Sequence, residues 1–174
     1  NAGKRTKVGL CSINLSGDSL SDETFFQYVE EQFQSTGIPG SLICFEITES
    51  MAIYNLSQTL RFIHKFKTHG CKFALDDFGS GFSSYGYLKS LPVDFLKIDG
   101  GFVRQMVSDP IDFAMVKSIN EVGHVMNTMT IAEFVENEET LLKLKEIGVD
   151  FVQGYGIGKP ELLSFERCTA GKIA

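Results

Sequence analysis

Short apolar runs alternate with longer amphipathic segments along the whole chain. Each run is short and mostly apolar, as expected for a strand that is buried on both faces. The expected strands are residues 8–14, 42–47, 72–76, 94–98, 129–132 and 150–153. No linker rich in Pro, Gly or Ser separates these runs, so the pattern predicts a single α/β domain, residues 1–174, with parallel strands.

Helical stripes with start and stop signals lie between the expected strands. The expected N-caps are Ser21, Asn55, Asp109 (followed by Pro110) and Asn137, and the expected stops are Gly37, Gly70 and Gly148. The apolar stripes are Phe25, Phe26, Val29 and Phe33; Leu56, Leu60, Ile63 and Phe66; and Met115, Ile119, Val122 and Met126. Amphipathic packing explains this spacing, so we expect these side chains to form the core.

The number of strands leaves two architectures open. Six strands are visible in 174 residues, whereas a closed (β/α) barrel has eight strands and typically about 250 residues. The chain therefore forms either an open parallel sheet or a TIM-like (β/α) barrel that lacks its first units.

Polar residues stand at the end of every expected strand. They are Asn14, Glu46 (with Glu49), Asp76 with Asp77, Lys97 (with Asp99), Glu133 and Gln153. A single polar residue at a strand end is ordinary, but six strands in succession predict an active site, because parallel α/β folds place catalytic groups there. The set is rich in the oxygen ligands that Mg²⁺ and Mn²⁺ prefer, and it contains no His or Cys to suggest zinc.

The adjacent pair Asp76 and Asp77 carries most information about a metal. Two neighbouring carboxylates repel each other unless a cation or an asymmetric environment compensates. Two divalent metals are a recurrent device for cleaving phosphoesters. The alternative is that one aspartate only caps the turn formed by residues 78–81.

Lys97 is expected to lie among these carboxylates. There it would orient a water molecule or balance charge in the transition state. In the alternative interpretation, Lys97 is no more than the ion-pair partner of Glu133 or Asp99.

Charge and cysteine content indicate which partners and which cellular compartment suit the protein. The formal charge of -6 and the pI near 5.1 argue against a surface that binds nucleic acid. The four cysteines have no metal-site or redox spacing and are expected to be reduced thiols of a cytoplasmic protein. No apolar run approaches the roughly 20 residues of a membrane helix, which leaves open a tether elsewhere in a longer parent protein.

Six segments together resemble the EAL domain family of bacterial phosphodiesterases. Residues 13–16 resemble its NLS motif, residues 45–49 resemble its ExTE motif, and residues 76–84 resemble its DDFGTGYSS loop. Further along the chain, residues 91–99 resemble its LPVDxLKID segment and residues 132–136 resemble its AEGVE motif. Residues 152–155 with 159–160 resemble its closing QGY and KP signature. The resemblance runs from Val8 to Leu162 in the order of the family. It implies hydrolysis of cyclic di-GMP to linear pGpG with Mg²⁺ or Mn²⁺, in bacterial second-messenger signalling.

The resemblance also implies a role for each site residue. Its metal ligands would be Asn14, Glu46 and Asp76 at one site, and Asp77 and Glu133 at a second, with Asp76 a candidate bridge between two metals. Lys97 resembles the lysine that assists the attacking water, and Gln153 resembles a member of the same catalytic cluster. Glu49 resembles the glutamate that holds the mobile loop after Asp77, residues 78–84.

Three departures from the family pattern stand out. No EAL segment precedes Asn14, so the glutamate that would complete the first metal site is not in this sequence. Phe134 replaces the glycine that usually follows Glu133, and Gly100 with Gly101 replaces an Arg-Ser pair. We expect an incomplete barrel that belongs to a longer parent, with this chain alone inactive or nearly so.

The resemblance also implies partners for the protein and leaves alternative functions to consider. A parent fused to GGDEF or sensory domains is expected, and exposed sheet edges favour a homodimer. The main alternative function is a catalytically inactive EAL domain that acts as a cyclic di-GMP receptor or a protein-interaction module. An unrelated phosphate-binding metabolic barrel would explain the carboxylates at the strand ends but not the run of motifs.

Overall fold

Six parallel strands form one sheet in the computed structural model, which describes residues 9–80 and 85–161. The strands are β1 (Cys11–Asn14), β2 (Ile43–Thr48), β3 (Lys72–Phe78), β4 (Phe95–Ile98), β5 (Met129–Ala132) and β6 (Phe151–Val152). All six predicted strands are confirmed, with their ends shifted by a few residues; Val8, the predicted start of the first, lies outside the described residues.

Helices follow each of the first five strands. They are α1 (Gly17–Ser21), α2 (Glu23–Thr36), α3 (Glu49–Tyr54), α4 (Leu56–Lys67), α5 (Tyr85–Leu88), α6 (Gly100–Gln105), α7 (Pro110–Val125) and α8 (Glu138–Ile147), with a 3₁₀ turn η1 (Gly40–Leu42) before β2. The four predicted helices are α2, α4, α7 and α8. The sequence pattern missed α1, α3, α5 and α6, because four to six residues are too few to show a helical period.

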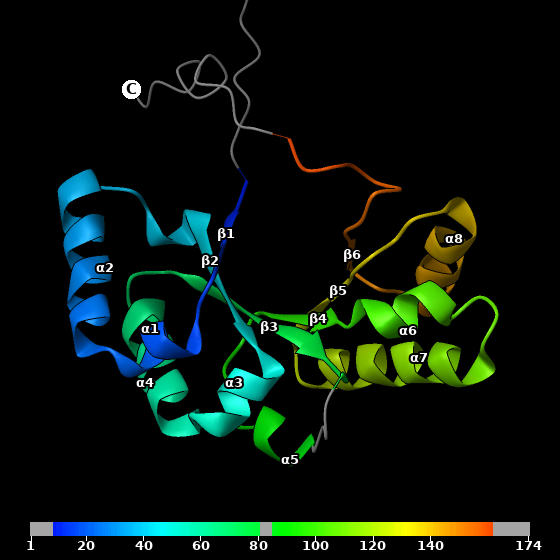
Figure 1. Ribbon diagram of the computed structural model, residues 1–174, viewed down its shortest axis with the longest axis horizontal. Helices are drawn as coiled ribbons and strands as arrows, with labels where there is room; N and C mark the ends of the chain where they lie inside the picture. The colour runs from blue at the N-terminus through cyan, green and yellow to red at the C-terminus, as the bar shows by residue number, and fades with distance from the viewer. Residues whose placement is uncertain (1–8, 81–84, 162–174) are drawn as a thin grey trace, which may run out of the picture.

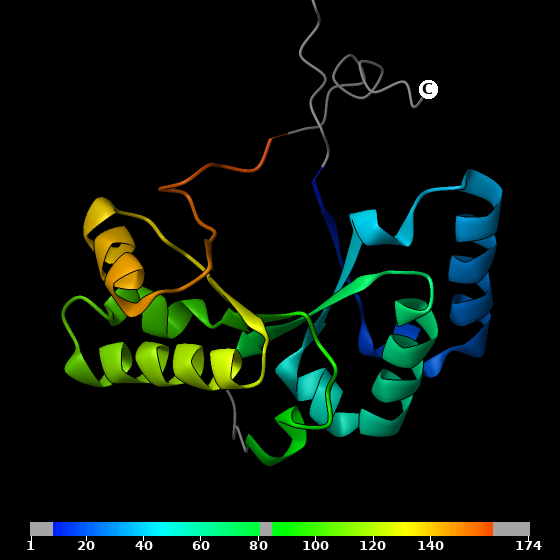
Figure 2. The same cartoon turned by 180° about the vertical axis from the view of Figure 1, so that it is seen from behind.

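The order of the strands decides between an open sheet and a barrel. Neighbours in the sheet follow chain order, β1-β2-β3-β4-β5-β6, and every pair is parallel. Right-handed crossovers in one direction put all connecting helices on one face, whereas a doubly wound sheet reverses its order and uses both faces. The sheet is curled, with α2 and α4 outside one half and α7 and α8 outside the other (Figures 1 and 2).

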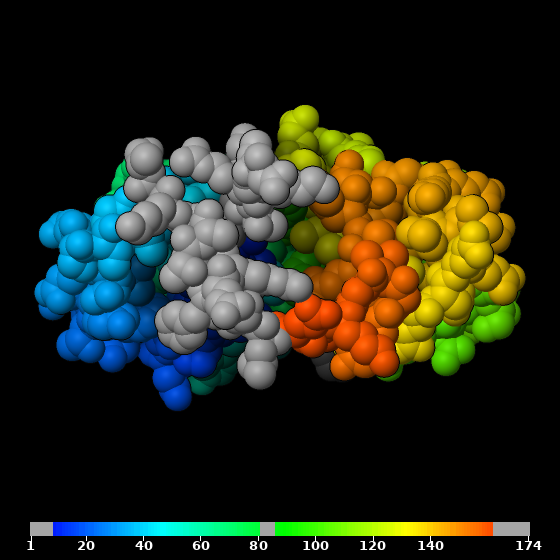
Figure 3. All heavy atoms as spheres, turned by 90° about the horizontal axis from the view of Figure 1, so that it is seen from above, coloured from blue at the N-terminus to red at the C-terminus, as the bar shows by residue number. Residues whose placement is uncertain are grey.

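The described chain is therefore an incomplete, TIM-like (β/α) barrel. Within residues 9–80 and 85–161, β1 and β6 are each paired on one side only. Seen from above, the half that contains α2 and the half that contains α8 occupy opposite sides of the molecule (Figure 3). The sheet is thus open between its first and last strands.

Phenylalanine side chains pack the first helices against the outer face of the sheet. Phe62 and Phe66 of α4 lie with their ring centroids 4.5 Å apart, and the ring of Phe26 in α2 meets Phe62 edge-on at 5.0 Å. Phe45 of β2 and Phe73 of β3 complete this cluster. Aromatic pairs of this kind contribute about 0.5–1.5 kcal/mol each beyond the area that they bury. The prediction that the helical stripes form the core is confirmed for every stripe residue except Met115, which is half-buried and is not among the residues of this core cluster or those packed against it.

Of the seven predicted cap positions, four are confirmed and three differ in the structure. Asp22, not Ser21, caps α2 and accepts a hydrogen bond from Thr24 N at 2.8 Å, because α1 extends as far as Ser21. Asn55 precedes α4, but its side chain makes no cap bond and donates to Ser21 Oγ instead. The cap positions confirmed by the structure are Asp109, Asn137, Gly37 and Gly148. Gly70, the other predicted stop, lies two residues beyond Thr68, the C-cap of α4.

The inner face of the curled sheet carries two layers of side chains. Cys44, Ala74 and Phe95 form a small buried apolar cluster with Ile131 packed against it. Side chains alternate between faces along a strand, so residues two positions further on point the same way. Those residues are Glu46, Asp76, Lys97 and Glu133. A polar layer therefore lies at the carboxyl end of an apolar inner layer, where barrel enzymes have their active sites.

Candidate functional site

Lys97 joins three strands through its ammonium group. Lys97 Nζ lies 2.7 Å from Glu46 Oε2, 2.8 Å from Asp76 Oδ1 and 2.9 Å from Glu133 Oε1. The Lys97 side chain is 5% exposed, so these contacts lie away from solvent. Asp99, the other partner considered for Lys97, instead caps α6 by accepting a hydrogen bond from Gly101 N at 2.8 Å.

A bulge in β3 turns two adjacent aspartates toward the site. Leu75 pairs with Leu96 and Phe78 pairs with Ile98, so both Asp76 and Asp77 lie opposite the single residue Lys97. A regular strand would place neighbouring side chains on opposite faces, and a bulge removes that constraint.

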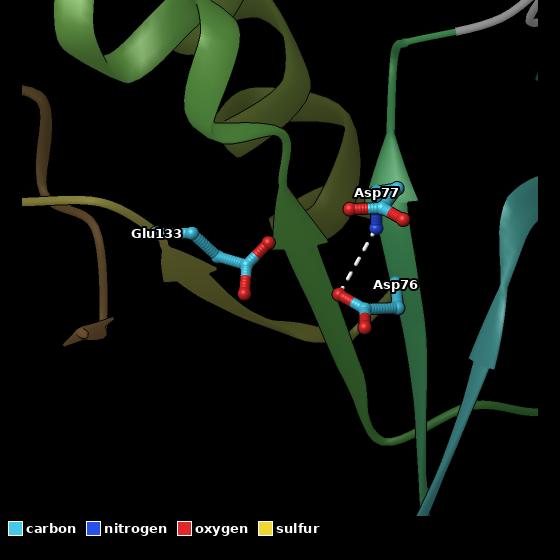
Figure 4. A group of neighbouring side chains, drawn as sticks. All are labelled: Asp76, Asp77 and Glu133. Atoms are coloured by element: carbon cyan, nitrogen blue, oxygen red, sulfur yellow. Dashed lines mark hydrogen bonds between the residues drawn. The ribbon is translucent and has the colours of Figure 1, made fainter. Parts of the chain in front are cut away.

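The backbone of Asp77 supports the same geometry. Its φ of 55° is left-handed, a conformation that aspartate tolerates better than most residues. Asp77 N donates to Asp76 Oδ1 at 3.0 Å, and the Glu133 carboxylate points toward the two aspartates (Figure 4). Within the described residues, the side chains of the two aspartates make no cap bond to the turn after Phe78; Ser80 instead bonds to the backbone carbonyl of Asp77.

Burial and crowding shift the pKa values of three groups. Burial raises the pKa of Asp77, and the charges of Asp76 and Asp99 raise it further. Burial also raises the pKa of Glu133, although the hydrogen bond from Lys97 opposes that shift. For Lys97 itself, burial acts to lower the pKa, but hydrogen bonds to Asp76, Glu46 and Glu133 outweigh it, so its pKa is raised. Lys97 is therefore charged at neutral pH.

The donor set fits a divalent cation. Asp76, Asp77 and Glu133 can each offer a carboxylate oxygen within 4.8 Å of the others. Together with Glu46 they make four carboxylates around the single ammonium of Lys97, so an excess of negative charge remains. Hard oxygen ligands of this kind suit Mg²⁺ or Mn²⁺, and a divalent ion would relieve the repulsion that raises the pKa of Asp77.

Two further predicted residues, Asn14 and Gln153, flank this cluster. Asn14 pairs with Glu46 in the β1–β2 ladder and therefore lies on the same face of the sheet, although it is exposed. Gln153 follows β6 and shares a cavity with Glu133. The structure thus brings Glu46, Asp76, Lys97 and Glu133 into direct contact and places Asn14 and Gln153 on either side of them.

Glu49 connects the segment after β3 to two helices. Its side chain at the start of α3 is buried, and Glu49 Oε2 accepts a hydrogen bond from Gly79 N at 3.0 Å. Tyr87 of α5 donates its hydroxyl to Glu49 Oε1. Burial and this bond raise the pKa of Tyr87. The remainder of the predicted loop, residues 81–84, lies outside the described residues.

Sequence reasoning missed Tyr87. The only signal was a tyrosine shortly after a glycine-rich segment, in a helix of four residues that shows no period. Its pairing with Glu49, 38 positions earlier, became visible only in the fold.

A cavity of about 380 Å³ adjoins the cluster. It is lined by Arg104, Glu133, Phe134, Glu136, Gln153, Gly154 and Tyr155. Phe134 has a left-handed backbone, with φ of 53°. A Cβ atom on Gly100 would lie 2.0 Å from Phe134 Cδ2, so the ring occupies the space that a side chain at position 100 would need. Two departures from the family pattern, Phe134 and Gly100, therefore pack against each other. Arg104 was not predicted, because nothing in the sequence pattern marked it.

Known proteins share much of this sequence. The sequence model described as "EAL domain" matches residues 2–160. The chain is 50% identical over 153 residues to "Cyclic di-GMP phosphodiesterase PdeB" of Shewanella oneidensis, which covers 88% of this chain and 18% of that protein. It is 42% identical over 154 residues to "Cyclic di-GMP phosphodiesterase PdeA" of Borreliella burgdorferi, covering 88% of this chain and 23% of that protein.

Solved structures of similar proteins share the fold of this chain. "Crystal structure of the EAL domain of Mycobacterium smegmatis DcpA" has a TM-score of 0.85 and 34% identity, and the match covers 94% of this chain and 73% of that one. "PaMucR Phosphodiesterase, c-di-GMP complex" has a TM-score of 0.82 and 32% identity, covering 87% and 61%. The chain thus spans about a fifth of the length of the two curated relatives and two thirds or so of these structures. None of the helices in residues 9–80 and 85–161 has the length and apolar character needed to cross a bilayer.

Proposed function

Because this chain belongs to the EAL domain family, we propose that it forms part of a phosphodiesterase that hydrolyses cyclic di-GMP to linear pGpG in bacterial second-messenger signalling. The observation that carries the proposal is the contact of Lys97 with Glu46, Asp76 and Glu133. Two relatives are named cyclic di-GMP phosphodiesterases, and one similar structure is a complex with c-di-GMP; both facts support this choice of substrate.

The proposal includes metal ions because the site offers suitable oxygen ligands. Asp76, Asp77 and Glu133 would hold Mg²⁺ or Mn²⁺, with Glu46 and Asn14 as further ligands and Asp76 as the bridge if two ions bind. Bound there, the metal supplies Lewis-acid activation of the phosphoryl oxygen and lowers the pKa of the attacking water.

The protein side chains act on charge and position. The oxygen of water bonds to phosphorus and water gives up a proton, while one P–O3′ bond breaks and O3′ takes up a proton, which leaves a 5′-phosphate and a 3′-hydroxyl. Lys97 is held charged by its three carboxylate contacts, so it serves as a hydrogen-bond donor and a counter-charge rather than as a base. Glu49 acts at a distance by fixing Gly79 and Tyr87.

The alternative of a catalytically inactive receptor is less well supported. A silent domain would have no need for Glu46, Asp76 and Glu133 around a buried lysine. Breaking such a buried cluster by removing one partner is costly, but replacing the whole cluster with apolar residues often is not. Chemistry at this site explains the cluster better than stability does.

The setting of the reaction is part of the same proposal. Cys11, Cys44 and Cys71 are free thiols, which suits a reducing cytoplasm. The open edges of β1 and β6 favour a homodimer, and fusion to GGDEF or sensory domains would supply the regulatory input.

The first prediction tests the metal assignment with Asp76→Asn in a longer parent protein that carries the upstream segment. Loss of this charged ligand should lower turnover of cyclic di-GMP, with Mg²⁺ or Mn²⁺, by more than about 100-fold. Asp109→Asn is the matched control, because Asp109 only caps α7 and amide oxygen can still accept from Ile111 N. Near-normal turnover of Asp76→Asn would remove the metal assignment.

A further inference from the structure

An arginine is stacked on an aromatic ring beside the catalytic cluster. Arg104 Cζ lies 4.1 Å from the centroid of the Phe134 ring, and Arg104 Nε lies 3.7 Å from Glu136 Oε1. Arg104 and Phe134 both line the 380 Å³ cavity, which Glu133 lines as well. We name the Arg104 guanidinium and the Phe134 ring the Arg104 platform.

The platform is built at some cost to the backbone. Phe134 is held at a φ of 53°, which a phenylalanine rarely adopts. Its ring fits only because Gly100 has no Cβ atom. Unfavourable backbone conformations persist where the surrounding structure imposes them, and they cluster at ligand sites. The ring is nevertheless 47% exposed, so burial of apolar surface does not by itself explain its position.

We propose that the Arg104 platform is a stacking subsite for a purine base of the substrate. This inference rests on the proposed function and extends it to the base. A guanidinium plane stacks well on a nucleobase, and the aromatic ring beneath holds that plane in one orientation. The cavity has the size of a small-ligand site.

The position of the platform supports this assignment. Glu133 lines the cavity and also touches Lys97, so a base on the platform lies next to the phosphodiester group that Lys97 would serve. The Arg104 side chain is 49% exposed, which leaves part of the guanidinium accessible to a ligand.

The test measures binding of cyclic di-GMP to this chain by calorimetric titration. Arg104→Ala should weaken binding about 5- to 150-fold, the range for loss of one stacked base. Arg61→Ala is the matched control, since Arg61 also lies over a phenylalanine, Phe26, but on α4; it should leave the Kd unchanged. Equal Kd values for Arg104→Ala and the unchanged chain would overturn the subsite alone. No binding by the unchanged chain would overturn the subsite, whereas the proposed function is tested separately by turnover in the longer parent.

Arg104→Lys separates stacking from a simple charge contact to phosphate. Lysine keeps the charge but has no planar face. Stacking predicts that Arg104→Lys weakens binding nearly as much as Arg104→Ala. Binding by Arg104→Lys at the level of the unchanged chain would show a phosphate contact and overturn the proposal.

Gly100→Ala tests the platform without removing any of its groups. The new Cβ must displace the Phe134 ring, so binding should weaken. In a Phe134→Gly background the same change at Gly100 should have no further effect on the Kd. Phe134→Gly should weaken binding yet leave the Tm unchanged or higher, because glycine relieves the left-handed backbone. A Tm that falls while the Kd stays constant would make Phe134 a structural residue and overturn the proposal.

Discussion

At the scale of single residues, Lys97 and its carboxylates define the electrostatics of the site. A buried ion cluster loses hydration of every charge, so the contacts of Lys97 with Glu46, Asp76 and Glu133 bring little net stability. The cluster therefore indicates function. Asp77 adds a further carboxylate whose pKa is raised by burial and by neighbouring charge.

The second prediction follows from that crowding at Asp77. Asp77→Asn removes an unfavourable charge and keeps a residue type that tolerates a left-handed backbone. After a discount for solvent screening of this partly exposed group, the metal-free protein should be more stable by about 0.5–1 kcal/mol, which corresponds to a rise in Tm of about 1–4 °C. Added Mg²⁺ should raise the Tm of the unchanged protein but not of the variant. Thermal unfolding with chelator and with Mg²⁺ measures both; equal metal shifts would exclude Asp77 as a ligand.

The third prediction concerns Asp94, away from the site. Burial alone would raise the pKa of Asp94, but hydrogen bonds from Lys72, Lys67 and Phe73 N outweigh it and hold the pKa below its ordinary value. A group with a lowered folded pKa stabilises fully above its unfolded value of about 3.9, and the contribution is lost as pH falls through the folded pKa.

Asp94→Asn should therefore destabilise by about 1–2 kcal/mol at pH 7, with a discount for the solvent-exposed lysines. The difference should shrink below about pH 4. Urea unfolding from pH 2 to pH 7 is the measurement. A constant difference over that range would show that the charge of Asp94 is irrelevant.

At the scale of elements, the end of β3 is coupled to α3 and α5 through Glu49. One carboxylate fixes both Gly79 N, directly after β3, and the hydroxyl of Tyr87. Hydrogen bonds to a buried carboxylate are strong, so this contact holds the end of β3 against α5.

The fourth prediction is that Glu49→Ala acts on catalysis through this connection. In the longer parent, turnover should fall about 10- to 100-fold while the Mg²⁺-dependent rise in Tm is retained, because Glu49 is not a proposed ligand. Tyr87→Phe removes one of the two bonds and should have a smaller effect. If Glu49→Ala also abolished the metal shift, Glu49 would belong to the metal site instead.

At the scale of the whole molecule, we expect the open sheet to limit turnover by this chain. The edges of β1 and β6 present unpaired backbone groups within the described residues, and the chain covers 61% and 73% of two similar structures. We expect a gap beside Asn14 to loosen the wall that would position the proposed ligands, on whose arrangement catalysis would depend.

The fifth prediction is that this chain alone turns over cyclic di-GMP slowly or not at all with Mg²⁺ or Mn²⁺. A version extended upstream should be at least about 100-fold faster, because it restores the wall and rigid positioning. Side-by-side assays at equal concentration are the measurement. Equal rates would show that the described residues suffice.

Local pattern in the sequence was enough for much of this result. The six strands, the four long helices and the polar residue at each strand end follow from periodicity and from the chemistry of parallel sheets. The same signals led to oxygen ligands and a divalent metal. They are visible in sequence because each depends on neighbours within a few positions.

Only the tertiary structure decided which residues meet. The β3 bulge that turns Asp77 toward Asp76, and the partners chosen by Lys97, depend on strand register, which local pattern does not specify. The packing of Phe134 against Gly100 joins positions 34 residues apart, and sequence showed them as two unrelated departures. Long-range contacts of this kind arise from how the sheet curls, and so they become visible only in the folded molecule.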